Sequence, residues 1–172
     1  STRRNLELTE ILREKRKKGS LLWVLDKTRT AMGARLLRSM VEQPLIHREE
    51  IERRHEAIEE LNSQMITREE LREYLNPIYD LERLIGRISY QTANARDLIA
   101  FKTSLAMLPP IRTLLEGFHS PLLREICQDL DTLEDIHGLI EAAVCEEPPV
   151  SLRDGEIIKD GFHQDVDKYR RA

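Results

Sequence analysis

The stretch that decides the fold runs from Gly19 to Leu45, GSLLWVLDKTRTAMGARLLRSMVEQPL, and holds the only tryptophan, Trp23. After a turn, its apolar residues recur every three or four positions, as they do on one face of a helix. These residues are Met32, Leu36, Leu37, Met40 and Val41. Glycine within a helix costs about 1 kcal/mol relative to alanine, so Gly33 suggests a close backbone approach. Pro44 ends the pattern. We therefore predict two short helices that meet at a hub of Trp23, Gly33 and Leu36, although an ordinary helical hairpin explains the pattern equally well.

The composition predicts an all-α fold, an irregular bundle of several helices. Of 172 residues, 40% are hydrophobic and 34% are charged, while glycine and proline number only 7 each. The net charge of −4 argues against a domain wrapped around nucleic acid phosphates, but it leaves room for a local basic patch. Cys127 and Cys145 lie on apolar helical patterns, which favours buried, reduced thiols and a cytoplasmic protein. No apolar run reaches the ~20 residues of a membrane helix.

Start and stop signals place further helices along the chain. We expect four of them at residues 47–64, 80–88, 95–108 and 111–115. Three more have recognisable start signals: one begins with a capping box at 67–70 and ends at Asn76-Pro77, one begins at Ser120-Pro121 and ends at Leu130, and one begins with a second capping box at 131–134 and ends at Val144. On the helix at 47–64 the predicted buried face holds Ile51, His55, Ile58 and Leu61, with Met65 beyond its end. Gly155 and Gly161 bracket a short apolar run, which predicts a hairpin or an extended segment there.

The last predicted helix begins at Gln164 and is still running at Ala172, which suggests a piece of a longer protein. We expect an apolar strip near Phe162, Val166 and Tyr169 that is either exposed or buried by a second copy of the chain. No GxxxxGK[ST] or GxGxxG motif is present, and no histidines or cysteines are at metal-ligand spacing. We therefore expect no catalytic, cofactor-binding or metal-binding residues in this chain.

An ordered set of motifs resembles the core (lever) domain of the MutS family of DNA mismatch repair proteins. The shared pattern is Gly19-Ser-Leu-Leu-Trp23, Leu25-Asp26, Thr28, Thr30, Met32-Gly33, Arg35-Leu36-Leu37, Gln43-Pro44-Leu45, Tyr79-Asp80-Leu81-Glu82-Arg83-Leu84, Ala93-Asn94, Arg96-Asp97-Leu98 and Glu147-Pro148-Pro149. The chain departs from the pattern at Ala34 and Glu156, where the family often has glycine, and at Ala95, where it commonly has proline. These changes affect local packing and turn geometry.

The resemblance implies a helical core at 1–150, followed at 151–172 by a hairpin and the start of a helix that leads toward a DNA clamp. It places Lys168, Arg170 and Arg171 near that clamp, although a solvated helix end explains these three residues as well. The chain itself would be no enzyme but a lever that couples an ATPase domain to the clamp, both of which lie outside it.

The resemblance also implies what the whole protein does. It would be a DNA-dependent ATPase that uses ATP and Mg²⁺, binds mismatched double-stranded DNA together with a second MutS copy, and works with a MutL-type repair partner. It would lie in the cytoplasm of a bacterial-type cell, on the nucleoid when bound to DNA, with no membrane contact. The alternative is a helical protein-interaction module with no nucleic-acid role. A small helical enzyme has no motif in its favour.

Overall fold

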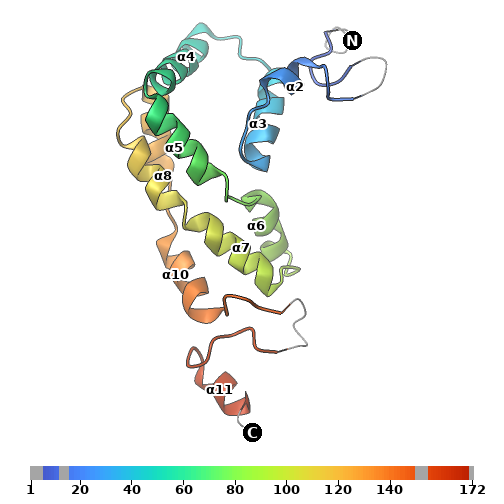
Figure 1. The fold of residues 1–172 in the computed structure, drawn as a ribbon, viewed down its shortest axis with the longest axis vertical. Coiled ribbons are helices and arrows are strands. Elements are labelled where there is room, and N and C mark those ends of the chain that lie inside the picture. The colour runs from blue at the N-terminus through green and yellow to red at the C-terminus, as the bar shows by residue number, and fades with distance from the viewer. Residues whose placement is uncertain (1–5, 12–15, 150–154, 171–172) are drawn as a thin grey trace. The chain divides into compact units, whose positions relative to one another are not determined.

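The computed structural model describes residues 6–11, 16–149 and 155–170, and this part of the chain is helical (Figure 1). The helices are α2 (Leu21–Leu25), α3 (Ala31–Glu42), α4 (Arg48–Ser63), α5 (Met65–Leu75), α6 (Leu81–Ser89), α7 (Ala95–Leu105), α8 (Leu108–Leu115), α9 (Pro121–Asp129), α10 (Glu134–Ala143) and α11 (Gln164–Arg170). The only β-pairing within the described residues is an isolated antiparallel bridge between Val144 and Ile158. The predicted all-α class is confirmed, and the predicted extended segment is present as this single bridge.

The chain divides into two compact units. Unit 1 comprises Ser1–Asn76 and Thr113–Asp129, and unit 2 comprises Pro77–Arg112 and Leu130–Ala172. The boundary predicted between residues 150 and 151 falls inside unit 2, among residues 150–154, which the structure does not describe. That boundary stays a prediction.

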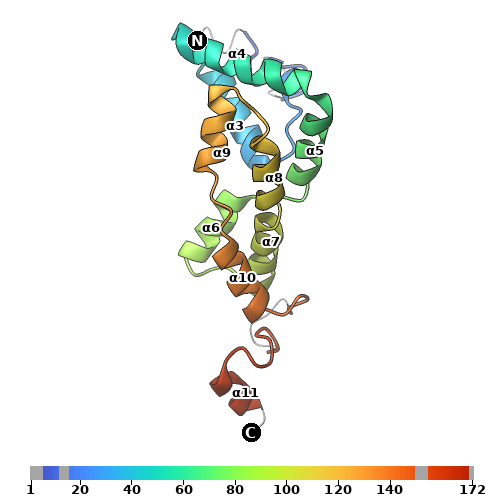
Figure 2. The ribbon, with the colours of Figure 1, turned by 90° about the vertical axis from the view of Figure 1, so that its left-hand side faces the viewer.

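In unit 1, α4 packs against both α5 and α9 (Figure 2). Ala57 is the buried residue of α4, and its small side chain allows a neighbouring helix to come close. The face predicted for this helix is partly wrong, because His55 is exposed and Ile58 is 54% exposed. The side chains of α4 that reach the α9 region are Arg53, which pairs with Glu125, and Glu60. The hydrophobic period therefore misplaced part of the buried face: Ile51 and Leu61 are partly buried as predicted, but a small residue and two charged residues share that face with them.

The two capping boxes predicted at 67–70 and at 131–134 are both wrong. Helix α5 begins at Met65, two residues before Thr67, so this threonine lies inside the first turn. Helix α10 begins at Glu134 after Leu133, which has a left-handed backbone conformation. The Asp131 carboxylate accepts a hydrogen bond from the Leu133 N–H at 3.0 Å. Asp131 therefore closes a turn before the helix instead of capping its first residues.

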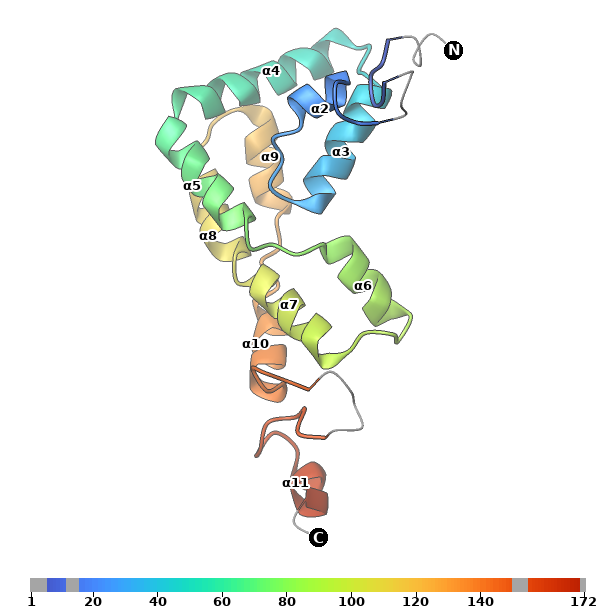
Figure 3. The same cartoon turned by 45° about the vertical axis from the view of Figure 1, so that its right-hand side comes forward.

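In unit 2, α7 packs against α6 and α10 around one apolar cluster (Figure 3). The buried members are Leu84, Ala95, Phe101, Leu105, Leu108, Ile140, Ala143 and Val144. Helix α7 begins with a complete capping box, in which Asn94 accepts from the Asp97 N–H and the Asp97 carboxylate accepts from the Asn94 N–H. The helix start predicted at residue 95 is confirmed, whereas the helix ends at Leu105 instead of residue 108.

The stretch Ala95–Leu115 is, by length and composition alone, apolar enough to cross a membrane, which the sequence inspection did not anticipate. Its apolar character has a direct structural explanation in this fold. Phe101, Leu105 and Leu108 belong to the core cluster of unit 2. Core helices commonly pass the same test of length and hydropathy.

Candidate functional site

The clearest built arrangement of polar side chains fastens α11 to the rest of unit 2. One guanidinium nitrogen of Arg170 donates to Asp160 Oδ1 at 2.6 Å, and the other donates to the Ile158 carbonyl at 2.8 Å. Both oxygens of the Asp167 carboxylate accept from the Gly161 N–H, at 3.1 and 3.0 Å. Helix α11 is thus held to the segment just before it through two of its own turns.

That segment is in turn fastened to the end of α10. The Cys145 N–H donates to the Ile157 carbonyl at 2.9 Å, and the Lys159 N–H donates to the Ala143 carbonyl at 2.8 Å. These two bonds flank the bridge between Val144 and Ile158. The chain therefore returns to α10 before it enters α11.

A charged cluster reinforces the same junction. The Lys159 ammonium donates to the Glu141 carbonyl at 2.7 Å and lies 3.5 Å from the Glu141 carboxylate. Lys102, on α7, pairs with the same carboxylate at 2.5 Å. The hydrogen bond and charge of Lys102, together with the charge of Lys159, lower the pKa of Glu141. Glu141 is therefore ionised at neutral pH and joins α7 and α10 to the segment that precedes α11.

We call this set the C-terminal tie. Its side chains are Lys102, Glu141, Lys159, Asp160 and Arg170. It runs from α7 through α10 and the extended segment to α11. Such a chain of contacts can hold α11 in register with the core of unit 2, but it contains no arrangement that would carry out a chemical reaction.

The residues predicted near a clamp have different surroundings. Lys168 is exposed on α11, whereas Arg170 is engaged in the C-terminal tie. Arg171 lies outside the described residues. The predicted apolar strip is present in part, because Phe162 and Tyr169 are exposed while Val166 is half-buried.

The predicted hub is not buried within unit 1. Trp23 is 47% exposed and Leu36 is 56% exposed, although α2 packs against α3. The close approach inferred at Gly33 involves no second backbone. A methyl group at Gly33 would lie 3.0 Å from the Thr30 hydroxyl oxygen and 3.6 Å from Thr28 Cβ, in the loop that begins the same helix. The Thr30 hydroxyl accepts from the Gly33 N–H at 3.0 Å, so the glycine makes room for the cap of α3.

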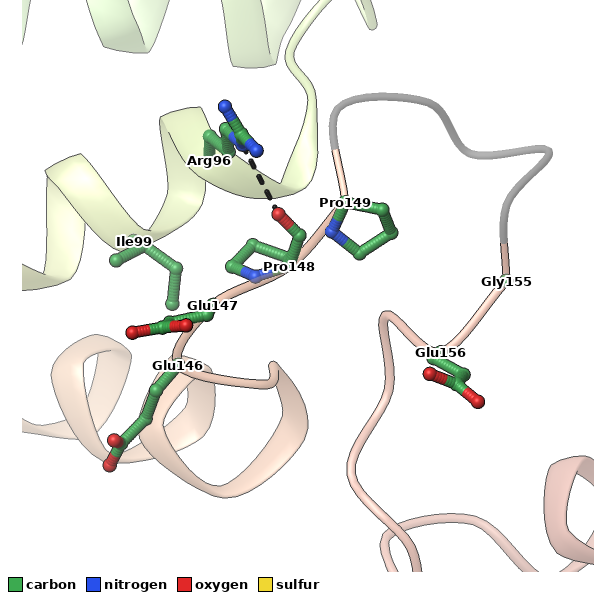
Figure 4. A pocket seen from close by; sticks show the side chains of 8 residues that line it. All are labelled: Arg96, Ile99, Glu146, Glu147, Pro148, Pro149, Gly155 and Glu156. Carbon is green, nitrogen blue, oxygen red and sulfur yellow. Dashed lines mark hydrogen bonds between the residues drawn. The ribbon is translucent and has the colours of Figure 1, made fainter.

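Beside the double proline, unit 2 has an open hollow of about 660 Å³ (Figure 4). It is lined by Arg96, Ile99, Glu146, Glu147, Pro148, Pro149, Gly155 and Glu156. Arg96 Nε donates to the Pro148 carbonyl at 3.2 Å, which holds the proline segment against the start of α7. No three histidine, cysteine, aspartate or glutamate side chains in the described part of the chain could together hold a metal ion.

Comparison with known proteins decides the family. A family model described as MutS domain III matches residues 1–170. The chain belongs to the MutS domain III family. This domain III chain is 63% identical to the DNA mismatch repair protein MutS of Lachnoclostridium phytofermentans over all 172 residues, which are 18% of that protein. It is 53% identical to MutS of Alkaliphilus oremlandii over 98% of the chain and 19% of that protein. It is 52% identical to MutS of Symbiobacterium thermophilum over 99% of the chain and 20% of that protein.

The family inferred from the motifs is thereby confirmed, and the relatives that the chain matches are named DNA mismatch repair proteins. It spans about a fifth of the length of these relatives. The C-terminal tie was not anticipated from its residues. Glu141 and Lys102 sit 39 positions apart, and neither belongs to a recognisable motif.

Proposed function

We propose that this chain is the mechanical lever of a MutS protein and couples an ATPase domain to a DNA clamp, both outside residues 1–172. In this proposal the whole protein binds ATP, Mg²⁺ and mismatched double-stranded DNA together with a second MutS copy and a MutL-type partner. It works in the bacterial cytoplasm. Residues 1–150 form the helical core of the lever, and residues 151–172 lead toward the clamp.

The C-terminal tie is the observation that supports this role. A lever transmits rotation only if its elements move as one body, because a loose joint would absorb the displacement. Packed cores are dense and resist compression, so motion passes through α7 and α10 with little loss. The tie extends this rigidity from α10 to α11 through Lys159, Asp160 and Arg170. The end of the chain that heads toward the proposed clamp is therefore fastened to the core of unit 2.

The contacts of the tie support different proposed roles for the two described basic residues of α11. Arg170 is used inside the chain, which supports a positioning role for it. Lys168 is exposed and remains the candidate for a contact with the clamp or with DNA. Arg171 keeps the same proposed role on sequence grounds alone.

The test uses the full-length MutS that contains this chain. The double variant Lys159→Gln/Arg170→Gln removes the donors on both sides of the extended segment. The control variant Arg83→Gln/Arg124→Gln removes the same number of positive charges from exposed positions on α6 and α9. ATP hydrolysis is measured with and without a mismatched duplex.

We expect the tie variant to keep the basal hydrolysis rate while its stimulation by mismatched DNA falls about fivefold. Partly exposed ion pairs contribute roughly 1 kcal/mol at most, which corresponds to a factor of about five in a coupling constant. The control should keep the stimulation of the unmodified protein. Equal stimulation in the tie variant and the unmodified protein would show that the tie does not carry the coupling.

A further inference from the structure

Leu133, the residue directly before α10, has a left-handed backbone conformation with φ 50° and ψ 41°. A leucine side chain crowds the following carbonyl oxygen in this conformation, so the conformation persists only where other contacts hold it. Two contacts do so here. The Asp131 carboxylate accepts from the Leu133 N–H at 3.0 Å, and the Leu133 side chain packs against the apolar cluster of unit 2. Leu133 is therefore a strained residue at the point where α10 begins.

The start of α10 at Glu134 leaves favourable interactions of the helix unused. Leu133 occupies the capping position, and its apolar side chain accepts no hydrogen bond from the helix. In a helix that begins at Glu134, the N–H groups of Glu134, Asp135 and Ile136 have no carbonyl one turn earlier within the helix. A start one half-turn earlier would provide partners for them.

The sequence contains such a start two residues before the one described. In Asp131-Thr132-Leu133-Glu134 an aspartate is followed three positions later by a glutamate, which is the pattern of a capping box. If Leu133 takes the ordinary helical conformation, the Asp131 carboxylate can accept from the Glu134 N–H instead of the Leu133 N–H. The Glu134 carboxylate can then accept from the Asp131 N–H. The same aspartate therefore serves both arrangements, and a rotation at Leu133 separates them.

Opposing contributions balance the two starts against each other. The earlier start relieves the strain at Leu133 and lets the N–H groups of Asp135 and Ile136 donate to carbonyls of the added turn. The start at Glu134 keeps the Leu133 side chain against the core cluster, where it is partly removed from water. Arg112 donates to the Leu130 carbonyl at 3.2 Å and fixes the chain just before this segment. The change is thus confined to the three residues that follow Leu130.

We propose that α10 has two alternative starts, Glu134 and Thr132, and that rotation of the Leu133 backbone switches between them. An extended residue spans about 3.3 Å and a helical one about 1.5 Å, so taking Thr132 and Leu133 into the helix shortens the chain by at most about 4 Å. Residues 130–133 carry the chain from α9 in unit 1 to α10 in unit 2. The switch therefore adjusts the length of this connection, a property that goes beyond the proposed lever role and does not depend on it.

Amide hydrogen exchange, followed by mass spectrometry on the full-length MutS that contains this chain, tests the two starts. It is measured without nucleotide or DNA, so the result is independent of the proposed coupling. The readout is the protection of the Asp135 and Ile136 N–H groups relative to their intrinsic exchange rates, because only the earlier start gives them helical partners. Leu133→Val should raise this protection about threefold or more, since a β-branched residue strongly disfavours the left-handed conformation. Leu133→Met, unbranched and of similar size, is the matched control and should leave the protection unchanged.

A second pair of variants tests the capping box itself. Glu134→Ala, added to Leu133→Val, removes the acceptor of the Asp131 N–H and should return the protection of Ile136 to about the level of the unmodified protein. Asp135→Ala, added to Leu133→Val, removes another acidic side chain from the first turn but no capping partner, so the gain should remain. Unchanged or lower protection in Leu133→Val would overturn the proposal, because simple loss of packing at Leu133 loosens the helix start. An equal gain in Leu133→Met, or a gain that survives Glu134→Ala, would overturn it as well.

Discussion

Glu60 fastens α4 to the start of α9, and its removal should loosen unit 1. Its carboxylate accepts from the backbone N–H groups of His119 at 2.7 Å and of Ser120 at 2.8 Å, directly before Pro121 opens α9. The Ser120 N–H lies at the start of α9, where a helix cannot satisfy its own N–H groups, and a negative charge at this end is also favoured by the helix dipole. We expect Glu60→Gln to destabilise unit 1 by about 1–2 kcal/mol at pH 7, because a neutral acceptor remains but the charge is lost.

The pH dependence of the stability of unit 1 should show that the ionised Glu60 carboxylate is the source of this stabilisation. Burial opposes ionisation of Glu60, but the hydrogen bonds from Ser120 and His119 outweigh it and lower the pKa of Glu60 from 4.5 to about 2. Since the folded pKa lies below the unfolded one, this stabilisation is fully present above pH 4.5 and is lost as the pH falls toward about 2. The advantage of the unmodified chain over Glu60→Gln should therefore shrink markedly as the pH drops to 3.

The only tryptophan provides the assay, because Trp23 lies in unit 1. Urea unfolding followed by tryptophan fluorescence should show a midpoint about 1 M lower for Glu60→Gln at pH 7, since the urea dependence of small units is roughly 1–2 kcal/mol/M. Glu59→Gln is the control, because the adjacent Glu59 is exposed. Equal midpoints for the two variants at pH 7, or a gap between them that is as wide at pH 3 as at pH 7, would refute the reasoning.

Two further predictions concern packing, and both use thermal unfolding followed by circular dichroism. Leu105→Ala should cost about 2–5 kcal/mol, because Leu105 is 1% exposed in the core of unit 2, whereas Leu139→Ala, at a position 60% exposed, should change stability by about 0.5 kcal/mol or less. Equal losses at the two positions would contradict the described core. Gly86→Ala should stabilise α6 by up to about 1 kcal/mol, since a methyl group there meets nothing within 4 Å. Gly33→Ala should gain less or destabilise, because its methyl group would crowd the Thr30 hydroxyl that caps α3. A gain in stability from Gly33→Ala equal to that from Gly86→Ala would show that the Thr30 side chain can move aside at no cost in free energy.

Local signals in the sequence predicted helix positions well where the capping partner is a near neighbour. Asp80 and Asn94 each accept from a backbone N–H three residues later, so a short window contains the whole interaction. The same kind of pattern failed at Thr67, because α5 follows α4 after a single intervening residue and needs no side-chain cap. A capping pattern indicates that a helix end is possible there, whereas the adjoining helix decides whether it occurs.

The contacts that join helices were not predictable, because they link residues far apart in the chain. Arg53 and Glu125 are separated by 72 positions, and Glu60 and Ser120 by 60. On α4 these charged residues took the packed face, and the apolar Ile58 was left in water. Hydrophobic periodicity assumes that apolar residues define the buried side, so it fails where a small alanine and ionised partners form the contact. The family, by contrast, was evident from motifs because their order along the chain is specific.

The interleaving of the two units constrains how this polypeptide can be made. The chain leaves unit 1 after Asn76, returns to it within α8, and leaves it again after Asp129. A ribosome delivering the chain from its first residue would release α4 well before α9 exists, so the Glu60 carboxylate stays bonded to water until the His119 and Ser120 amides have been made. No single proteolytic nick or gene truncation can yield one unit whole, and attempts to express either alone would require joining its two pieces by a new linker.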